Sequence, residues 1–92
     1  MIISFKDKDS ALLASGVRVK RLRRLKESLI AKLRQLQIAA SLNDLRIPPG
    51  NRLEALSGKR KGQYSIRIND QYRICFVWTP AGPAEVEITD YH

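Results

Sequence analysis

Apolar and polar residues alternate along residues 63–78, whose sequence is QYSIRINDQYRICFVW. The even positions are mostly apolar on both sides of Asn69 and Asp70, two residue types that favour turns. This pattern predicts a β-hairpin with one apolar face. Because successive side chains of a strand point to opposite faces, Arg67 and Arg73 fall together on the other face. Two arginines on one sheet face indicate an anion-binding site.

A second pattern, with leucines at intervals of three and four, covers residues 18–40 and predicts one long helix. Its apolar stripe consists of Leu22, Leu25, Leu29, Leu33, Leu36 and Ala40. Its other faces carry the basic residues Arg18, Lys20, Arg21, Arg23, Arg24, Lys26, Lys32 and Arg34. Such a face is either solvated surface or an electrostatic landing surface for RNA or an acidic partner.

Shorter patterns predict the remaining elements. Residues 2–5 form an apolar run that predicts an initial strand, and residues 11–14 predict a short helix ending at Gly16. Ser41 and Asp44 have the spacing of a capping box, so a helix of about two turns should follow until the prolines at 48 and 49. Residues 52–56 and 84–89 predict further strands. We therefore expect an α+β fold with an N-terminal strand and two or three helices packed on an antiparallel β-sheet.

Length and charge narrow the functional classes. The 92 residues make a single domain, residues 1–92, and a net charge of +8 with a pI near 10.2 favours a polyanionic partner or an acidic protein. The lone Cys75 lies inside the apolar strand, which excludes a disulfide framework, and no metal-ligand spacing is present. No signal-peptide pattern or membrane-length apolar run occurs, so we expect a soluble cytoplasmic protein without a membrane partner.

The loop SGKRKG at residues 57–62 places Lys59, Arg60 and Lys61 between two glycines. Glycine lets a backbone approach a phosphate closely, and the three cations supply charge. The same composition also favours an ordinary solvent-facing turn. The loop is therefore a candidate RNA contact whose motif is weak by itself.

The last three residues, Asp90, Tyr91 and His92, can carry acid–base chemistry. His92 is the single histidine, and an imidazole is the side chain best suited to proton transfer near neutral pH. Asp90 can orient that imidazole, and the ring of Tyr91 can stack on a base. The alternative is a strand end capped by polar residues, with Tyr91 packed on the edge of the core.

Arg73 lies in the middle of a predicted strand and should be largely enclosed. An enclosed guanidinium needs an anionic partner. That partner is either a carboxylate, from Glu54, Glu85 or Glu87, or a bound phosphate whose transition-state charge the guanidinium stabilises. The sequence leaves both possibilities open. Tyr64 and Tyr72 are expected in the core rather than as platforms for bases.

Four segments together resemble one family: the opening MIxSF, the stretch PPGNRLEALSG at 48–58, the core SIRINDQYRICF and the terminal DYH. They are similar to the HigB toxins, also called plasmid maintenance system killer proteins, of the RelE/ParE superfamily. The resemblance covers essentially the whole chain. It implies a compact toxin with an antiparallel sheet backed by helices, which binds the ribosome, cuts messenger RNA in the decoding site and is restrained by an antitoxin encoded beside it.

The resemblance also implies an active site. Arg73, Asp90, Tyr91 and His92 match family positions one by one. Two positions depart, because Glu54 and Ser57 stand where well-described relatives have a histidine and a lysine. A carboxylate can replace a histidine as a base but supplies no positive charge, so Glu54 is a candidate second acid/base. Lys59 or Lys61 can supply the cation that Ser57 lacks.

We hypothesise a metal-independent, ribosome-dependent messenger RNA endonuclease that needs no cofactor. Its partners would be a HigA-like antitoxin, the ribosome and messenger RNA, with operator DNA bound only by the toxin–antitoxin complex. Ribosomal RNA would be bound by Arg18, Lys20, Arg21, Arg23, Arg24, Lys59, Arg60, Lys61 and Arg67. The alternatives are a ParE-like toxin that inhibits DNA gyrase and a non-catalytic nucleic-acid-binding module. The terminal Asp-Tyr-His favours the ribonuclease.

Overall fold

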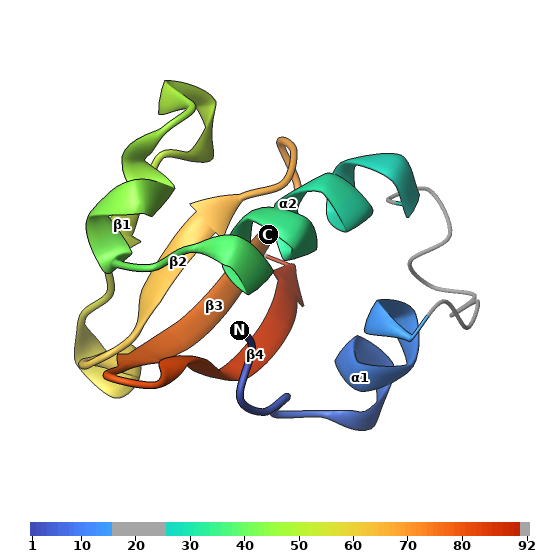
Figure 1. The fold of residues 1–92 in the computed structure, drawn as a ribbon, viewed down its shortest axis with the longest axis horizontal. Coiled ribbons are helices and arrows are strands. Elements are labelled where there is room, and N and C mark those ends of the chain that lie inside the picture. Colours follow the sequence, from blue (N-terminus) through green and yellow to red (C-terminus); the bar gives the residue numbers. More distant parts are fainter. Residues whose placement is uncertain (16–25, 91–92) are drawn as a thin grey trace.

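The computed structural model describes residues 1–15 and 26–90. Its centre is a four-stranded antiparallel sheet in the order β1-β2-β3-β4, and helix α2 lies across one face of it (Figure 1). The strands are β1 (Glu54–Ala55), β2 (Tyr64–Arg67), β3 (Tyr72–Thr79) and β4 (Gly82–Asp90). The predicted α+β class is confirmed.

Helices lie on the side of α2, beside β4 and in the loop between β1 and β2. They are α1 (Lys8–Ala14), α2 (Lys26–Ile38) and the 3₁₀ helices η2 (Leu42–Arg46), η3 (Pro49–Asn51) and η4 (Gly58–Arg60). Helix α1 stands beside β4 (Figure 1), where the Ile88 amide donates a hydrogen bond of 3.1 Å to Ser10 Oγ. No helix in the described part of the chain has the length and apolar character needed to cross a membrane.

The central hairpin forms as predicted. Strand β2 pairs with β3 so that Ile66 faces Ile74 and Arg67 faces Arg73. The apolar face is buried in one core with leucines of α2, and Tyr64 and Tyr72 pack against that core as expected. The core consists of Leu29, Leu33, Leu36, Ala39, Leu45, Ile66, Ile68, Ile74, Phe76, Val86 and Ile88. Cys75 is also fully buried, which confirms its assignment as a sheet residue.

Helix α2 confirms part of the predicted stripe. Leu29, Leu33 and Leu36 are buried, whereas residues 18–25, including Leu22 and Leu25, lie outside the described residues. At the other end the prediction is wrong, because Ala39 is buried and Ala40 is exposed. The helix ends at Ile38, so helical spacing no longer decides which of the next residues faces the core.

The predicted initial strand is reduced to one isolated parallel bridge between Phe5 and Val86. Around it, the Val86 amide donates to the Ser4 carbonyl and the Lys6 amide donates to the Val86 carbonyl, both at 3.0 Å. A longer ladder is blocked because Pro83 has no N–H, and because the Glu85 amide donates to Ser4 Oγ instead of to a backbone carbonyl. The segment therefore covers the edge of β4 without becoming a full strand.

A β-bulge sets the phase of β4. Val77 faces Ala84 while Cys75 faces Glu87, so β4 has one extra residue between these pairs, and Glu85 there has φ 53°. As predicted, Val86 and Ile88 point into the core. The bulge leaves Glu87 and Thr89 in register with Cys75 and Arg73 on the polar face of β3.

The predicted two-turn helix after Ser41 is instead the five-residue 3₁₀ helix η2. Its start was located correctly, since Ser41 and Asp44 form a capping box. Its early end follows from Pro48, because a proline disfavours helical dihedrals at the residue before it and cannot donate the next hydrogen bond. Ile47 accordingly has extended dihedrals.

The capping carboxylate of Asp44 makes stability depend on pH. It accepts hydrogen bonds from the amides of Ala40 at 2.9 Å and Ser41 at 3.1 Å, and these bonds lower the pKa of Asp44. A lowered carboxyl pKa stabilises the fold above the unfolded-state pKa of about 3.9, and this contribution disappears as pH falls through the folded-state pKa. We therefore expect Asp44→Asn to lower the melting temperature at neutral pH and to make the fall of the melting temperature below about pH 4 less steep. Thermal denaturation followed by circular dichroism at several pH values would measure the melting temperature of each protein. Melting temperatures that fall equally with pH in the two proteins would contradict the prediction.

Candidate functional site

Arg73 is the second residue of β3 and points to the sheet face opposite α2. Its side chain is only 12% exposed, which confirms the predicted enclosure. In register it lies between Arg67 on β2 and Thr89 on β4. The hydroxyl of Thr89 is buried and has no hydrogen-bond partner among the described residues. The guanidinium is therefore held between two strands with polar side chains on both sides.

The Arg73 guanidinium has several polar partners among the described residues. Its Nε donates to Ser65 Oγ at 2.8 Å and its Nη2 donates to the Arg52 carbonyl at 2.7 Å. Nη2 also forms an ion pair with Glu54 Oε1 at 3.8 Å. Among the three carboxylates considered from the sequence, Glu54 is therefore the one in contact, and Glu87 pairs with other cations.

Glu54 and Arg73 are two predicted site residues that the fold brings together. Glu54 lies on β1 in register with Ser65, and its side chain is 54% exposed while its oxygen faces the guanidinium. An exposed carboxylate beside an enclosed cation can exchange a proton with a substrate that the cation binds. This pair is the chemical centre of the candidate site.

Asp90 ends β4 beside this centre but on the other face. It lies in register with Tyr72, one position beyond the Thr89–Arg73 pair, and its Oδ2 accepts a hydrogen bond of 3.0 Å from Gln71 Nε2. Because side chains alternate along a strand, Asp90 and Arg73 point to opposite faces at neighbouring positions. Tyr91 and His92 lie outside the described residues, so their roles stay predictions.

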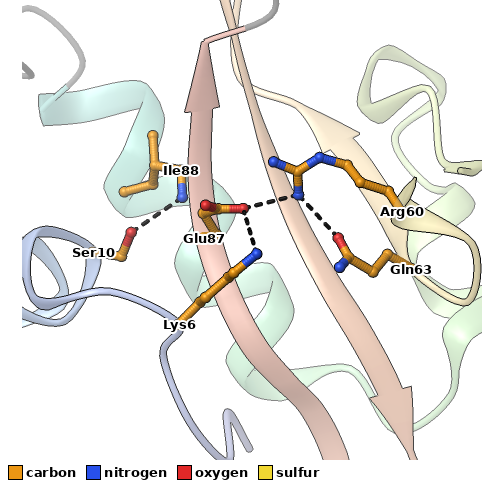
Figure 2. Close-up of polar contacts among 6 residues, drawn as sticks. All are labelled: Lys6, Ser10, Arg60, Gln63, Glu87 and Ile88. Carbon is orange, nitrogen blue, oxygen red and sulfur yellow. Dashed lines mark hydrogen bonds and ion pairs between the residues drawn. The ribbon is translucent and has the colours of Figure 1, made fainter. Parts of the chain in front are cut away.

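A second polar cluster fixes the basic loop on the same face (Figure 2). Arg60 Nη1 donates to Glu87 Oε1 at 2.9 Å and to Gln63 Oε1 at 3.1 Å, and Lys6 Nζ lies 3.9 Å from the same Glu87 oxygen. Arg60 therefore ties η4 to β4, a structural role that the sequence did not predict. Lys59 and Lys61 on either side of it are exposed.

The other predicted cations have different surroundings. Arg67 forms an ion pair with Asp70 in the hairpin turn. Lys32 donates to Asn51 Oδ1, and burial together with the nearby charge of Arg67 lowers the pKa of Lys32. Lys32 therefore contributes less to a basic landing surface than the sequence indicated. Arg18, Lys20, Arg21, Arg23 and Arg24 lie outside the described residues.

A cavity of about 490 Å³ lies between the N-terminal segment, α1 and α2. Its described lining is mostly apolar, with Arg34 as its charged side chain, and it shares no residue with the cluster around Arg73. Phosphate chemistry needs both a cation and groups that transfer protons. The polar face of the sheet, rather than this cavity, is therefore the candidate site.

Comparison with known proteins identifies the family. A sequence profile described as the RelE-like toxin of the type II toxin-antitoxin system HigB matches residues 5–92. The chain belongs to the HigB-like toxin family. The resemblance identified from the sequence is thereby confirmed.

Two curated relatives match part of this HigB-like toxin. Toxin HigB-1 of Vibrio cholerae is 52% identical over 54 residues, which are 59% of this chain and 57% of that protein. An uncharacterized protein of Haemophilus influenzae is 46% identical over 48 residues, which are 52% of this chain and 48% of that protein. The chain thus spans about half the length of the curated relatives it matches.

Two groups in the site were not predicted from the sequence. The hydroxyl of Ser65 had a detectable signal, because strand alternation places this small polar residue on the same face as the two arginines. The carbonyl of Arg52 had none, since a backbone acceptor leaves no mark in the sequence. The contact of Ser65 with Arg73 depends on the pairing of β2 with β3, and that of the Arg52 carbonyl depends on the position of β1 beside β2.

Proposed function

We propose that this HigB-like toxin is a cytoplasmic, metal-independent endoribonuclease that cleaves messenger RNA on the ribosome and so inhibits translation and growth. The observation that carries the proposal is the Arg73–Glu54 pair, an enclosed guanidinium 3.8 Å from an exposed carboxylate. Membership of a family of RelE-like toxins supports the same conclusion.

The reaction would be attack of a ribose 2′-hydroxyl on the adjacent phosphate. A new bond forms between the 2′-oxygen and phosphorus, and the bond from phosphorus to the 5′-oxygen breaks. The proton of the 2′-hydroxyl goes to a base, the leaving 5′-oxygen takes a proton from an acid, and a cation stabilises the extra negative charge on the phosphoryl oxygens. Protein side chains can supply all three functions.

We assign Arg73 to the phosphoryl oxygens because its side chain is already oriented and enclosed. His92 would transfer protons, and Asp90 would orient the imidazole or share the proton that it carries. Tyr91 would position a nucleobase of the RNA. Glu54 would be the second acid or base, since its exposed carboxylate lies next to Arg73. The face that carries Asp90 differs from that of Arg73, so Asp90 would act through its neighbours in the sequence rather than at the phosphate.

The partners follow from the charge of +8 and from the family. Exposed cations such as Lys59 and Lys61 would dock on ribosomal RNA, together with the basic residues at positions 18–24. A HigA-like antitoxin with acidic segments would neutralise the toxin, and operator DNA would be bound only by that complex. Arg60 would act mainly by holding the loop, because Glu87 already pairs with it.

Primer extension on a messenger translated with and without the toxin tests this function. We expect cuts that require the ribosome and whose rate falls by about 10²- to 10⁴-fold in His92→Ala, because a general acid or base contributes a factor of that size. Ser28→Ala, a change at an exposed residue of α2, is the control and should cleave like the wild type.

Other results would favour the alternative functions. Inhibited gyrase supercoiling without cuts would identify a ParE-like toxin, because the fold alone does not separate the two activities. Salt-sensitive binding to RNA or DNA with neither effect would identify a non-catalytic binding module. Unchanged cutting in His92→Ala would overturn the assignment of proton transfer to that residue.

A further inference from the structure

The guanidinium of Arg73 is oriented by two neutral acceptors from different parts of the chain. Ser65 Oγ on β2 accepts from Nε at 2.8 Å, and the carbonyl of Arg52, just before β1, accepts from Nη2 at 2.7 Å. A guanidinium is planar, so two hydrogen bonds to different nitrogens fix both its position and the orientation of its plane. The plane decides which phosphate geometry the side chain can bind.

The position of Ser65 in the sheet allows its hydroxyl to accept the hydrogen bond from Arg73 Nε. It is 0% exposed and lies in register with Cys75, two residues beyond Arg73 on the same face, so Ser65 and Arg73 are diagonal neighbours across β2 and β3. Its carbonyl oxygen also lies 3.4 Å from Arg73 Nη2. The Ser65 hydroxyl therefore serves as an acceptor for Arg73 Nε, because alanine would pack equally well at this buried position.

Arg52 uses an uncommon backbone conformation to supply its carbonyl. As the residue that ends η3, it has φ 46° and ψ 53°, in the left-handed region that residues other than glycine seldom adopt. Backbone strain of this kind concentrates at functional sites, where the surrounding structure maintains it. Here the turn between η3 and β1 brings the carbonyl to the guanidinium.

We propose that Ser65 and the Arg52 carbonyl are positioning groups that hold the Arg73 guanidinium in the orientation needed to bind the scissile phosphate. The inference rests on the proposed ribonuclease function and adds two groups to its site. Ser65 and the carbonyl touch neither the phosphate nor the attacking hydroxyl, and they act through Arg73. A misplaced catalytic group can cost about 100-fold in rate even when it is still present.

The first test compares Ser65→Ala with Ser65→Thr, which keeps a hydroxyl at the same position. We expect Ser65→Ala to lower kcat for ribosome-bound messenger about 10- to 100-fold with little change in KM, and Ser65→Thr to restore most of the lost rate. Ser28→Ala, at an exposed serine of α2, should match the wild type. Rates must be measured below the melting temperature of each variant, determined separately. Equal kcat for wild type and Ser65→Ala would overturn the proposal.

The second test asks whether Ser65 acts through Arg73. In an Arg73→Ala background, Ser65→Ala should cause no further loss of the residual rate, because the side chain it positions is gone. A further loss as large as in the wild-type background would show that Ser65 acts independently and would overturn the inference.

The third test needs no cleavage assay. In ¹⁵N-edited NMR spectra, the Arg73 Nε–H should exchange slowly with water in the wild type, because this proton is enclosed and bonded to Ser65. We expect exchange at least about 10-fold faster in Ser65→Ala. A wild type that fails to cleave would refute the proposed function but leave this measurement intact, whereas unchanged exchange in Ser65→Ala would refute the positioning role alone.

Discussion

Arg73→Lys is expected to slow ribosome-dependent cleavage by about 100- to 1,000-fold, the range found when one donor to a transition-state oxyanion is removed. Lysine keeps the positive charge near Glu54 but replaces a planar fork of donors with a single ammonium. An ammonium has a single nitrogen, so it cannot bond to Ser65 Oγ and the Arg52 carbonyl from two nitrogens of one plane, as Arg73 does. Arginine geometry, rather than charge alone, should therefore determine the rate.

Single-turnover cleavage of a ribosome-bound messenger by toxin in excess would measure this effect, because it isolates the chemical step from product release. Arg34→Lys on α2 is the matched control, since it makes the same exchange at an exposed position that lines the apolar cavity. Sedimentation with ribosomes should be the same for all three proteins. Full cleavage by Arg73→Lys would mean that positive charge suffices, and would overturn the role assigned to the guanidinium geometry.

The sequence predicted the hairpin and the enclosure of Arg73 because both depend on local patterns. Alternation along β2 and β3 is strict enough to decide which face each side chain occupies, and the Asn69–Asp70 turn fixes which residues face one another. Arg73 lies between β2 and β4, so neighbouring side chains enclose it, whereas Arg67 next to the hairpin turn is 33% exposed. For the same reason Val86 and Ile88 could be assigned to the core from their spacing alone.

The environment of Arg73 could not be predicted because it depends on pairing across the sheet. Strand β1 is only two residues long, too short to show alternation, yet it supplies Glu54, and the chain just before it supplies the Arg52 carbonyl. Three carboxylates were equally acceptable partners from the sequence. The register of β1 with β2 places Glu54 opposite Ser65 and so beside Arg73. Glu87 instead contacts Arg60 and Lys6.

Long-range competition also explains the two elements that were predicted wrongly. The N-terminal run has the composition of a strand, but its partner edge contains Pro83 and the bulge at Glu85, so few backbone bonds can form. The segment after Ser41 has a good cap, but Pro48 stops it within five residues. In both cases the local preference was real and a neighbouring proline limited it.

Asn51→Ala is expected to lower the free energy of unfolding by about 2–4 kcal/mol, the range for losing several buried hydrogen bonds together. Asn51 is 0% exposed and joins α2 to η2 and η3. Its Oδ1 accepts from Lys32 Nζ, and its Nδ2 donates to Gln35 Oε1 at 2.8 Å and to the Leu45 carbonyl at 3.1 Å. Alanine would leave the buried Leu45 carbonyl without this donor and a partly buried ammonium without this acceptor.

Urea denaturation followed by the fluorescence of Trp78 would measure the change in the free energy of unfolding, provided that unfolding remains two-state. Asn43→Ala is the control, because Asn43 is exposed on η2 and its side chain accepts one hydrogen bond within the described part of the chain, from Arg46 Nε at 3.0 Å. Asn43→Ala should lower the free energy of unfolding by no more than about 0.5 kcal/mol. A similar small loss for Asn51→Ala would mean that water or a rearranged loop replaces the network.

The Asn51 variant also separates stability from activity at the site. Asn51 precedes Arg52, whose left-handed conformation supplies the carbonyl to Arg73, and its side chain fixes η3 against α2. If the network only stabilises the fold, Asn51→Ala should cleave at the wild-type rate at temperatures where it is fully folded. If the network also holds Arg52 in place, cleavage should fall about 10-fold or more under the same conditions, because the guanidinium loses the Arg52 carbonyl as an acceptor. We expect the second result, since the strained residue lies directly beside the buried amide and within the same 3₁₀ turn.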